Sequence, residues 1–100
     1  MQTHTSLSSI REKLHHELPL LSDRYHVISL GMFGSYVRQE QSKGSDLDLL
    51  VTFDETPSLL TFIELENYLA GLLGIKVDLV MRDALKPRIG ERILDEVVPV

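Results

Sequence analysis

Apolar residues follow two different spacings along this chain. Repeats of three and four residues, typical of helices with one buried face, cover residues 8–17, 57–73 and 87–96. Alternating or continuous apolar runs, typical of strands, cover residues 26–33, 47–53 and 75–81. The pattern therefore predicts a fold that mixes helices with strands.

Several residues predict where these elements end. Pro19 should end the first helix, because a proline disfavours helical geometry in the residue before it. Thr56 should cap the second helix with Pro57 at its first position, and Gly74 should end it. The apolar residues 97–100 predict a short edge strand or a tail tucked into the core, with a partner-binding patch as the less common alternative.

Three acidic residues fall on the second and third predicted strands. Side chains alternate between the two faces of a strand, so Asp46 and Asp48 share one face and leave the other face apolar. Asp78 lies on the matching face of the third strand. The intervening helix predicts a right-handed crossover, which makes the two strands parallel and places them adjacent or one apart. If they are adjacent, at about 4.8 Å, the three carboxylates converge on one open face.

Carboxylates at this spacing repel one another, which raises their pKa values unless a cation lies among them. Magnesium prefers hard oxygen ligands and usually binds through one or two carboxylates plus substrate phosphates. We therefore expect Asp46, Asp48 and Asp78 to bind magnesium, with Asp78 aiding activation of an attacking hydroxyl as a ligand or base. The plainer alternative is turn chemistry at residues 44–46, but the joint spacing of the acids favours the metal site.

A Gly-Ser pair follows the first predicted strand. Gly34 lets the backbone approach a ligand closely, and a helix beginning at Ser35 would present free N–H groups and a positive dipole end. Ser35 can cap this helix or donate to a phosphate oxygen, and Arg38 can add a charged donor one turn later. These residues predict a nucleotide-binding site for the triphosphate.

Composition and charge narrow the class of protein. The 100 residues predict one domain, and 43% hydrophobic with 25% charged residues is typical of soluble globular proteins. The net charge of -5 argues against direct nucleic acid binding. The chain has no cysteine, no signal-peptide pattern and no long apolar run, so we expect a cytoplasmic protein without a membrane segment.

Gly34-Ser35, the run Ser45–Val51 and the later Val77–Val80 together resemble the polymerase-beta-type nucleotidyltransferases, and within them the minimal nucleotidyltransferases (MNT), antitoxin partners of HEPN toxins. The resemblance covers about residues 8–98. It implies an α/β (α+β) fold, a small mixed β-sheet flanked by helices. One departure is Gln39, where many relatives carry a glycine, which leaves the shape of the loop over 39–44 open.

The same resemblance implies roles for the site residues. It implies that Gly34 and Ser35 bind the triphosphate of ATP and that Asp46, Asp48 and Asp78 bind magnesium. It also implies transfer of AMP from ATP to a protein acceptor, a tyrosine of the partner HEPN toxin. The alternative to an enzyme is a binding protein, a non-catalytic antitoxin that neutralises a toxin by protein–protein contact. The three acids favour the enzyme, because a purely steric role needs no carboxylate trio.

Overall fold

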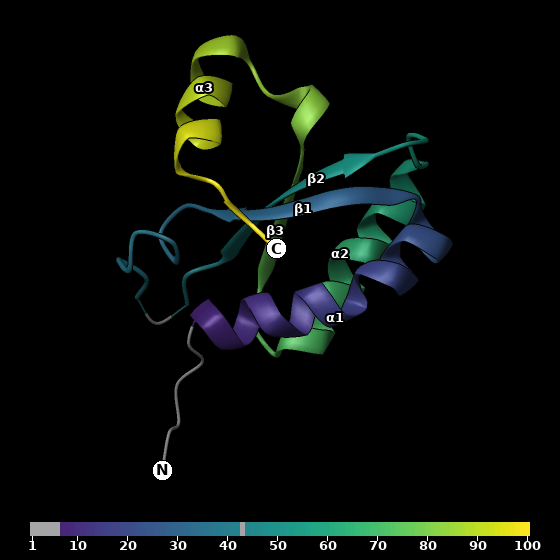
Figure 1. Cartoon of the computed structure of the whole chain (residues 1–100), viewed down its shortest axis with the longest axis horizontal. Coiled ribbons are helices and arrows are strands. Elements are labelled where there is room, and N and C mark those ends of the chain that lie inside the picture. The colour runs from purple at the N-terminus through teal and green to yellow at the C-terminus, as the bar shows by residue number, and fades with distance from the viewer. Residues whose placement is uncertain (1–6, 43) are drawn as a thin grey trace.

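A four-stranded mixed sheet with helices on both sides forms the centre of the protein (Figure 1). This computed structural model describes residues 7–42 and 44–100. The elements in chain order are α1 (Leu7–Tyr25), β1 (Val27–Phe33), β2 (Leu47–Phe53), α2 (Leu59–Leu73), β3 (Val77–Met81), the 3-10 turn η1 (Arg82–Ala84), α3 (Pro87–Glu96) and β4 (Val98–Pro99).

The strand order is β3-β2-β1-β4. β1 runs antiparallel to both β2 and β4, whereas β2 and β3 are parallel neighbours joined through α2. Asp48 lies directly opposite Asp78 in this parallel pair. The predicted mixed sheet and the adjacent, parallel acid-bearing strands are therefore confirmed.

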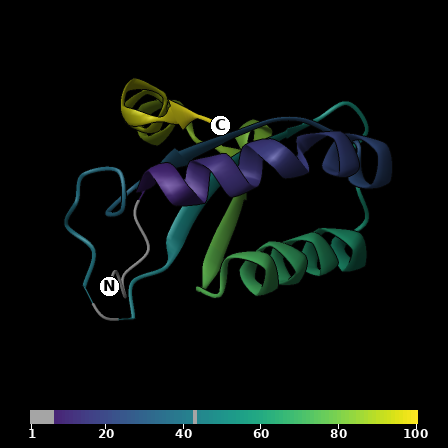
Figure 2. The same ribbon diagram turned by 60° about the horizontal axis from the view of Figure 1, so that its bottom comes forward.

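The hydrophobic core lies between one face of the sheet and the helices α1 and α2, which run side by side across that face (Figure 2). The sheet contributes the residues that alternate with the acids, and the helices contribute apolar residues at helical spacing. The fully buried members are Met32 from β1, Leu47, Leu49 and Val51 from β2, Ile10, Leu14 and Leu21 from α1, and Leu65 and Leu69 from α2. α3 lies on the opposite side of the sheet (Figure 1). The acid-bearing face is therefore left outside the main core.

The first helix is longer than predicted. α1 continues through Pro19 to Tyr25, although a proline inside a helix lacks the N–H of one backbone hydrogen bond. Leu21 and Tyr25 lie beyond the proline, and both are buried in the core. Their burial offsets the free-energy cost of the proline in the helix. The local sequence pattern around Pro19 does not reveal this burial.

The second helix begins later than predicted. Ser58, not Thr56, is its N-cap, and the Ser58 hydroxyl accepts a hydrogen bond from the Thr61 N–H at 3.2 Å. Pro57 therefore precedes the helix instead of occupying its first position. The predicted end is correct, because Gly74 adopts the left-handed conformation with φ of 70°.

The C-terminal residues form the short edge strand β4, one of the two commoner alternatives for the apolar tail. Arg11 Nε of α1 donates to the Pro99 carbonyl at 2.8 Å, so this strand is also tied to the first helix. Among the described helices, none is long and apolar enough to cross a membrane.

Candidate functional site

Asp48 and Asp78 form a close acidic pair on the face of the sheet away from α1 and α2. They face each other across β2 and β3, with Asp48 half-buried and Asp78 exposed. Asp46 is exposed and lies just before β2. The structure therefore brings two of the three predicted ligands together directly and holds the third close by.

The electrostatics of Asp48 reflect this crowding. Burial, followed by the charges of Asp78 and Asp46 and a hydrogen bond with Asp78, raises the pKa of Asp48 from 3.8 to about 6, against a lowering effect of Arg38. A cation among these oxygens would reduce the repulsion and lower the pKa of Asp48.

The acidic pair fits a divalent cation in its chemistry. Within residues 7–42 and 44–100, however, no three Asp, Glu or His side chains are grouped closely enough to hold a metal ion by themselves. Magnesium usually takes only one or two carboxylates and completes its shell with water and phosphate oxygens, so a close pair with a third acid nearby suits it.

Gly34 connects the acidic pair to the turn after β1. Its φ is 84°, a conformation that favours glycine, and a Cβ at this position would lie 2.0 Å from Asp48 Oδ2. Any side chain here would therefore displace the Asp48 carboxylate. Gly34 is needed both for the backbone conformation and for the room that it leaves to Asp48.

Residues 34–39 form a single turn, not the predicted helix. The Arg38 N–H donates to the Gly34 carbonyl at 3.1 Å, and the chain then turns away at Gln39, whose φ is 58°. The N–H groups of Ser35 and Tyr36 have no acceptor in the described part of the chain. One turn is enough to leave free donors beside Gly34, which is what anion binding requires.

Glu96, the last residue of α3, reaches the same turn. Its Oε2 accepts the Gly34 N–H at 2.9 Å, and Arg38 Nη1 donates to both carboxylate oxygens at 3.0 and 3.1 Å. Partial burial acts to raise the pKa of Glu96, but the hydrogen bonds from Gly34 and Arg38 hold that pKa below its usual value. Sequence reasoning missed this residue, because no local pattern relates positions 62 residues apart.

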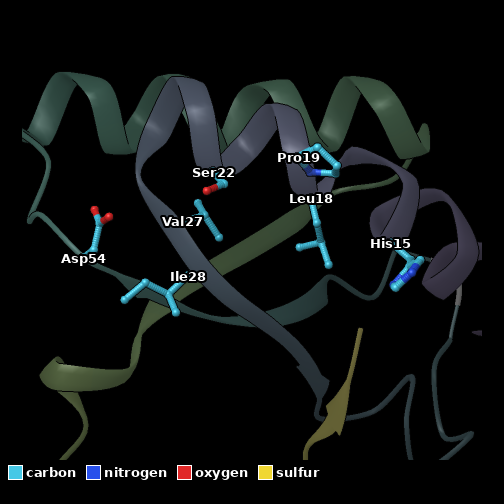
Figure 3. A pocket seen from close by; sticks show the side chains of 7 residues that line it. All are labelled: His15, Leu18, Pro19, Ser22, Val27, Ile28 and Asp54. Atoms are coloured by element: carbon cyan, nitrogen blue, oxygen red, sulfur yellow. The ribbon is translucent and has the colours of Figure 1, made fainter.

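A pocket of about 340 Å³ adjoins this ion pair. Its lining joins the turn after β1 to α3, and consists of Phe33, Gly34, Arg38, Ile89, Arg92, Ile93 and Glu96. A larger pocket of about 500 Å³ lies between α1 and β1 (Figure 3), and none of the predicted site residues lines it. The smaller pocket is therefore the one that belongs to the site.

Comparisons with known proteins show the family of this chain. The chain matches the nucleotidyltransferase domain over residues 9–100. It is 56% identical to Protein adenylyltransferase MntA of Thermococcus cleftensis over 80 aligned residues. This aligned region covers 80% of this chain and 81% of the relative.

Solved structures give the same result. One described provisionally as a minimal nucleotidyltransferase matches with a TM-score of 0.81 and 38% identity, over 99% of this chain and 100% of that chain. A toxin–antitoxin crystal structure with AMP-PNP matches with a TM-score of 0.73 and 26% identity, over 89% of this chain and 70% of that chain. This chain therefore belongs to the nucleotidyltransferase family, and it has the polymerase-beta-like fold of a minimal nucleotidyltransferase.

Proposed function

We propose that this chain transfers AMP from ATP to a tyrosine hydroxyl of a partner HEPN toxin and so acts as an antitoxin. The observation that carries the proposal is the contact between the two halves of the site: the Asp48 carboxylate lies against Gly34, at the start of the turn that offers free N–H groups. Acids for a metal and donors for phosphate are thus next to each other, as phosphoryl chemistry requires.

Gly34, Ser35 and Arg38 would bind the triphosphate in this proposal. The Ser35 hydroxyl makes no hydrogen bond within the described residues, so it is available to a phosphate oxygen. Asp46, Asp48 and Asp78 would hold magnesium, which supplies charge stabilisation of the phosphate oxygens when bound. The acceptor oxygen would bond to the α-phosphorus, pyrophosphate would leave, and Asp78, which is exposed, would take the hydroxyl proton.

Two observations support a protein as the acceptor. The pocket beside Gly34 is lined only by the end of β1, the turn that follows it and α3, and the acidic pair lies on the sheet face away from α1 and α2. The related structure with AMP-PNP is a toxin–antitoxin complex. A docked partner would bring its hydroxyl to the acids from outside this chain.

The non-catalytic antitoxin remains a second candidate, and an exposed apolar cluster favours it. Leu59, Leu60 and Ile63 of α2 are 73%, 80% and 42% exposed, on a helix that covers the sheet face away from the acids. Contact through such a cluster could neutralise a toxin without chemistry. The two candidates make opposite predictions for variants of the acids.

The deciding experiment combines the chain with a HEPN protein as the candidate partner. Incubated with ATP and magnesium, the partner should gain the mass of one or more AMP groups. The Asp46→Asn, Asp48→Asn double variant should lose this transfer, because removing metal ligands can take away several kcal/mol of transition-state stabilisation. Each ~1.4 kcal/mol of that loss slows the reaction tenfold. Asp83→Asn, which changes an exposed acid in η1, is the matched control and should transfer normally.

Relief of toxicity separates the two candidates. The triple variant Asp46→Asn, Asp48→Asn, Asp78→Asn should still bind the partner, because the exposed apolar residues of α2 are unchanged. If this variant relieves toxicity as well as the unmodified chain does at equal expression, neutralisation is steric and the proposed enzyme function is wrong.

A further inference from the structure

The turn proposed to bind triphosphate already holds an anion from its own chain. The Glu96 carboxylate receives the Gly34 N–H and the Arg38 guanidinium, at 2.9 Å and 3.0 Å. We call Gly34 and Arg38 together the anion seat. Both are donors that a phosphate oxygen would use, and the single Gly34 N–H cannot serve two acceptors at full strength.

We infer that Glu96 is a built-in competitor of ATP, which the triphosphate must displace from the anion seat. This inference rests on the proposed function, because it concerns the same nucleotide site. When a binding site is open in only a fraction of the molecules, the apparent Kd equals the intrinsic Kd divided by that fraction. The Glu96 ion pair therefore sets the ATP concentration at which the protein becomes loaded.

The position of Glu96 keeps the free-energy cost of its release low. Its side chain is 26% exposed and that of Arg38 is 47% exposed, so water screens the pair and can solvate both groups after separation. α3 is also lightly attached, since Gly90 is its only buried residue among those described. Local opening of weakly buried elements has a low free-energy cost.

The residues that follow Glu96 limit the movement. Val98 pairs with Met32 of β1, and a Cβ at Gly31 would lie 2.4 Å from Val97 Cγ2, so the chain is held immediately after Glu96. Displacement therefore involves the Glu96 side chain and the last turn of α3, while β4 stays in the sheet.

A competing role for Glu96 gives the opposite prediction. The carboxylate could instead hold Arg38 in the orientation that ATP needs, as a positioning residue. Removing its charge would then weaken nucleotide binding, whereas removing a competitor would strengthen it. The sign of the change in affinity decides between the two roles.

The experiment is titration calorimetry of the full chain with AMP-PNP and magnesium. Glu96→Gln keeps the size of the side chain and removes its charge, and it should tighten binding by about five- to tenfold. Asp95→Asn removes a neighbouring exposed charge of the same helix and should change affinity less than about twofold, because exposed charges are screened. Equal tightening by both variants would show a general charge effect and overturn the inference.

The remaining outcomes separate this inference from the proposed function. Unchanged or weaker binding by Glu96→Gln, with normal binding by the unmodified chain, overturns the competitor role alone. If neither protein binds AMP-PNP, the proposed function fails and the inference fails with it. A second measurement needs no variant: the carbon-13 resonance of the Glu96 carboxyl should move to the position of a solvated glutamate as AMP-PNP is added. A resonance that stays in place through saturation contradicts displacement.

Discussion

At the scale of single residues, the site contains one carboxylate in an unfavourable environment and one backbone conformation that favours glycine. Asp48 is half-buried beside two other acids, and Gln39 adopts a φ of 58° that favours glycine. Such strain persists when the surrounding fold over-determines it, and it is common at functional sites. Each case has a measurable consequence for stability.

The first prediction concerns the metal-free protein and pH. The pKa of Asp48 is about 6 in the folded protein against 3.8 ordinarily, so the folded state binds more protons between these values and stability falls as pH rises through them. Asp48→Asn removes this cost. In EDTA its unfolding free energy should match that of the unmodified protein near pH 4 and exceed it by about 1–2 kcal/mol at pH 8, after allowance for solvent screening.

Denaturant titrations at both pH values test this prediction. Magnesium at pH 8 should then stabilise the unmodified protein more than Asp48→Asn, which narrows the gap. Asp83→Asn, the same change at an exposed position in η1, serves as the control and should not gain the stability that Asp48→Asn gains at pH 8. If the unfolding free energies of the unmodified protein and Asp48→Asn differ by the same amount from pH 4 to pH 8, the raised pKa of Asp48 is contradicted.

The second prediction concerns the departure from the glycine of many relatives. Gln39 is exposed and left-handed, a conformation that costs a non-glycine residue about 1–2 kcal/mol. Gln39→Gly should raise the unfolding free energy by about 0.5 kcal/mol, because the greater freedom of glycine in the unfolded chain offsets part of the relief. Gln41→Gly, at an exposed loop position without positive φ, should lower stability instead. Thermal unfolding measures the change in unfolding free energy of both variants. If both changes have the same sign, the explanation by the positive φ of Gln39 is wrong.

At the scale of elements, burial overrides local preference. α1 keeps Pro19 in its interior because residues on both sides of it are needed in the core. The turn after β1 stops after one helical turn because the chain reverses at Gln39. In both elements the length predicted from the sequence was wrong, because α1 continues past Pro19 and the turn at Gly34 stops short of a helix.

The third prediction follows from Pro19. It is exposed, so its replacement by alanine removes no core packing and restores a backbone N–H to the helix. Pro19→Ala should raise the unfolding free energy by about 1–2 kcal/mol, less than the full cost of ~3 kcal/mol because proline also restricts the unfolded chain. Lys13→Ala, another exposed position of α1, should change it by less than about 0.5 kcal/mol. Urea denaturation measures both variants, and a destabilised Pro19→Ala protein would mean that Pro19 itself stabilises α1.

At the scale of the whole molecule, the sheet joins segments that are far apart in sequence into one site. β1 carries the turn with Gly34, β2 and β3 carry the acids, and α3 and β4 bring Glu96 back across the edge of β1. The C-terminal segment therefore closes the site, and it is held in turn by α1 through Arg11.

The fourth prediction tests how closely this segment packs. Gly31→Ala should lower the unfolding free energy by about 1–3 kcal/mol, because the new Cβ would overlap the stiff, branched side chain of Val97. Gly71→Ala, in α2 with no atom near the added Cβ, should raise it by about 0.5–1 kcal/mol. Thermal unfolding should therefore show a lower unfolding free energy for Gly31→Ala and a higher one for Gly71→Ala. If Gly31→Ala is neutral, β4 does not hold the C-terminal segment tightly.

The sequence by itself determined the three longer strands, the face that Asp48 and Asp78 share, the end of α2 at Gly74 and the beginning of α3 at Pro87. These depend on side-chain periodicity and on the backbone preferences of single residues, which are local properties. Only the tertiary structure decided that α1 continues through Pro19, that the turn at Gly34 stops short of a helix, and that Glu96 occupies the anion seat. Those features depend on burial and hydrogen bonds between residues distant in the chain, and no local pattern records them.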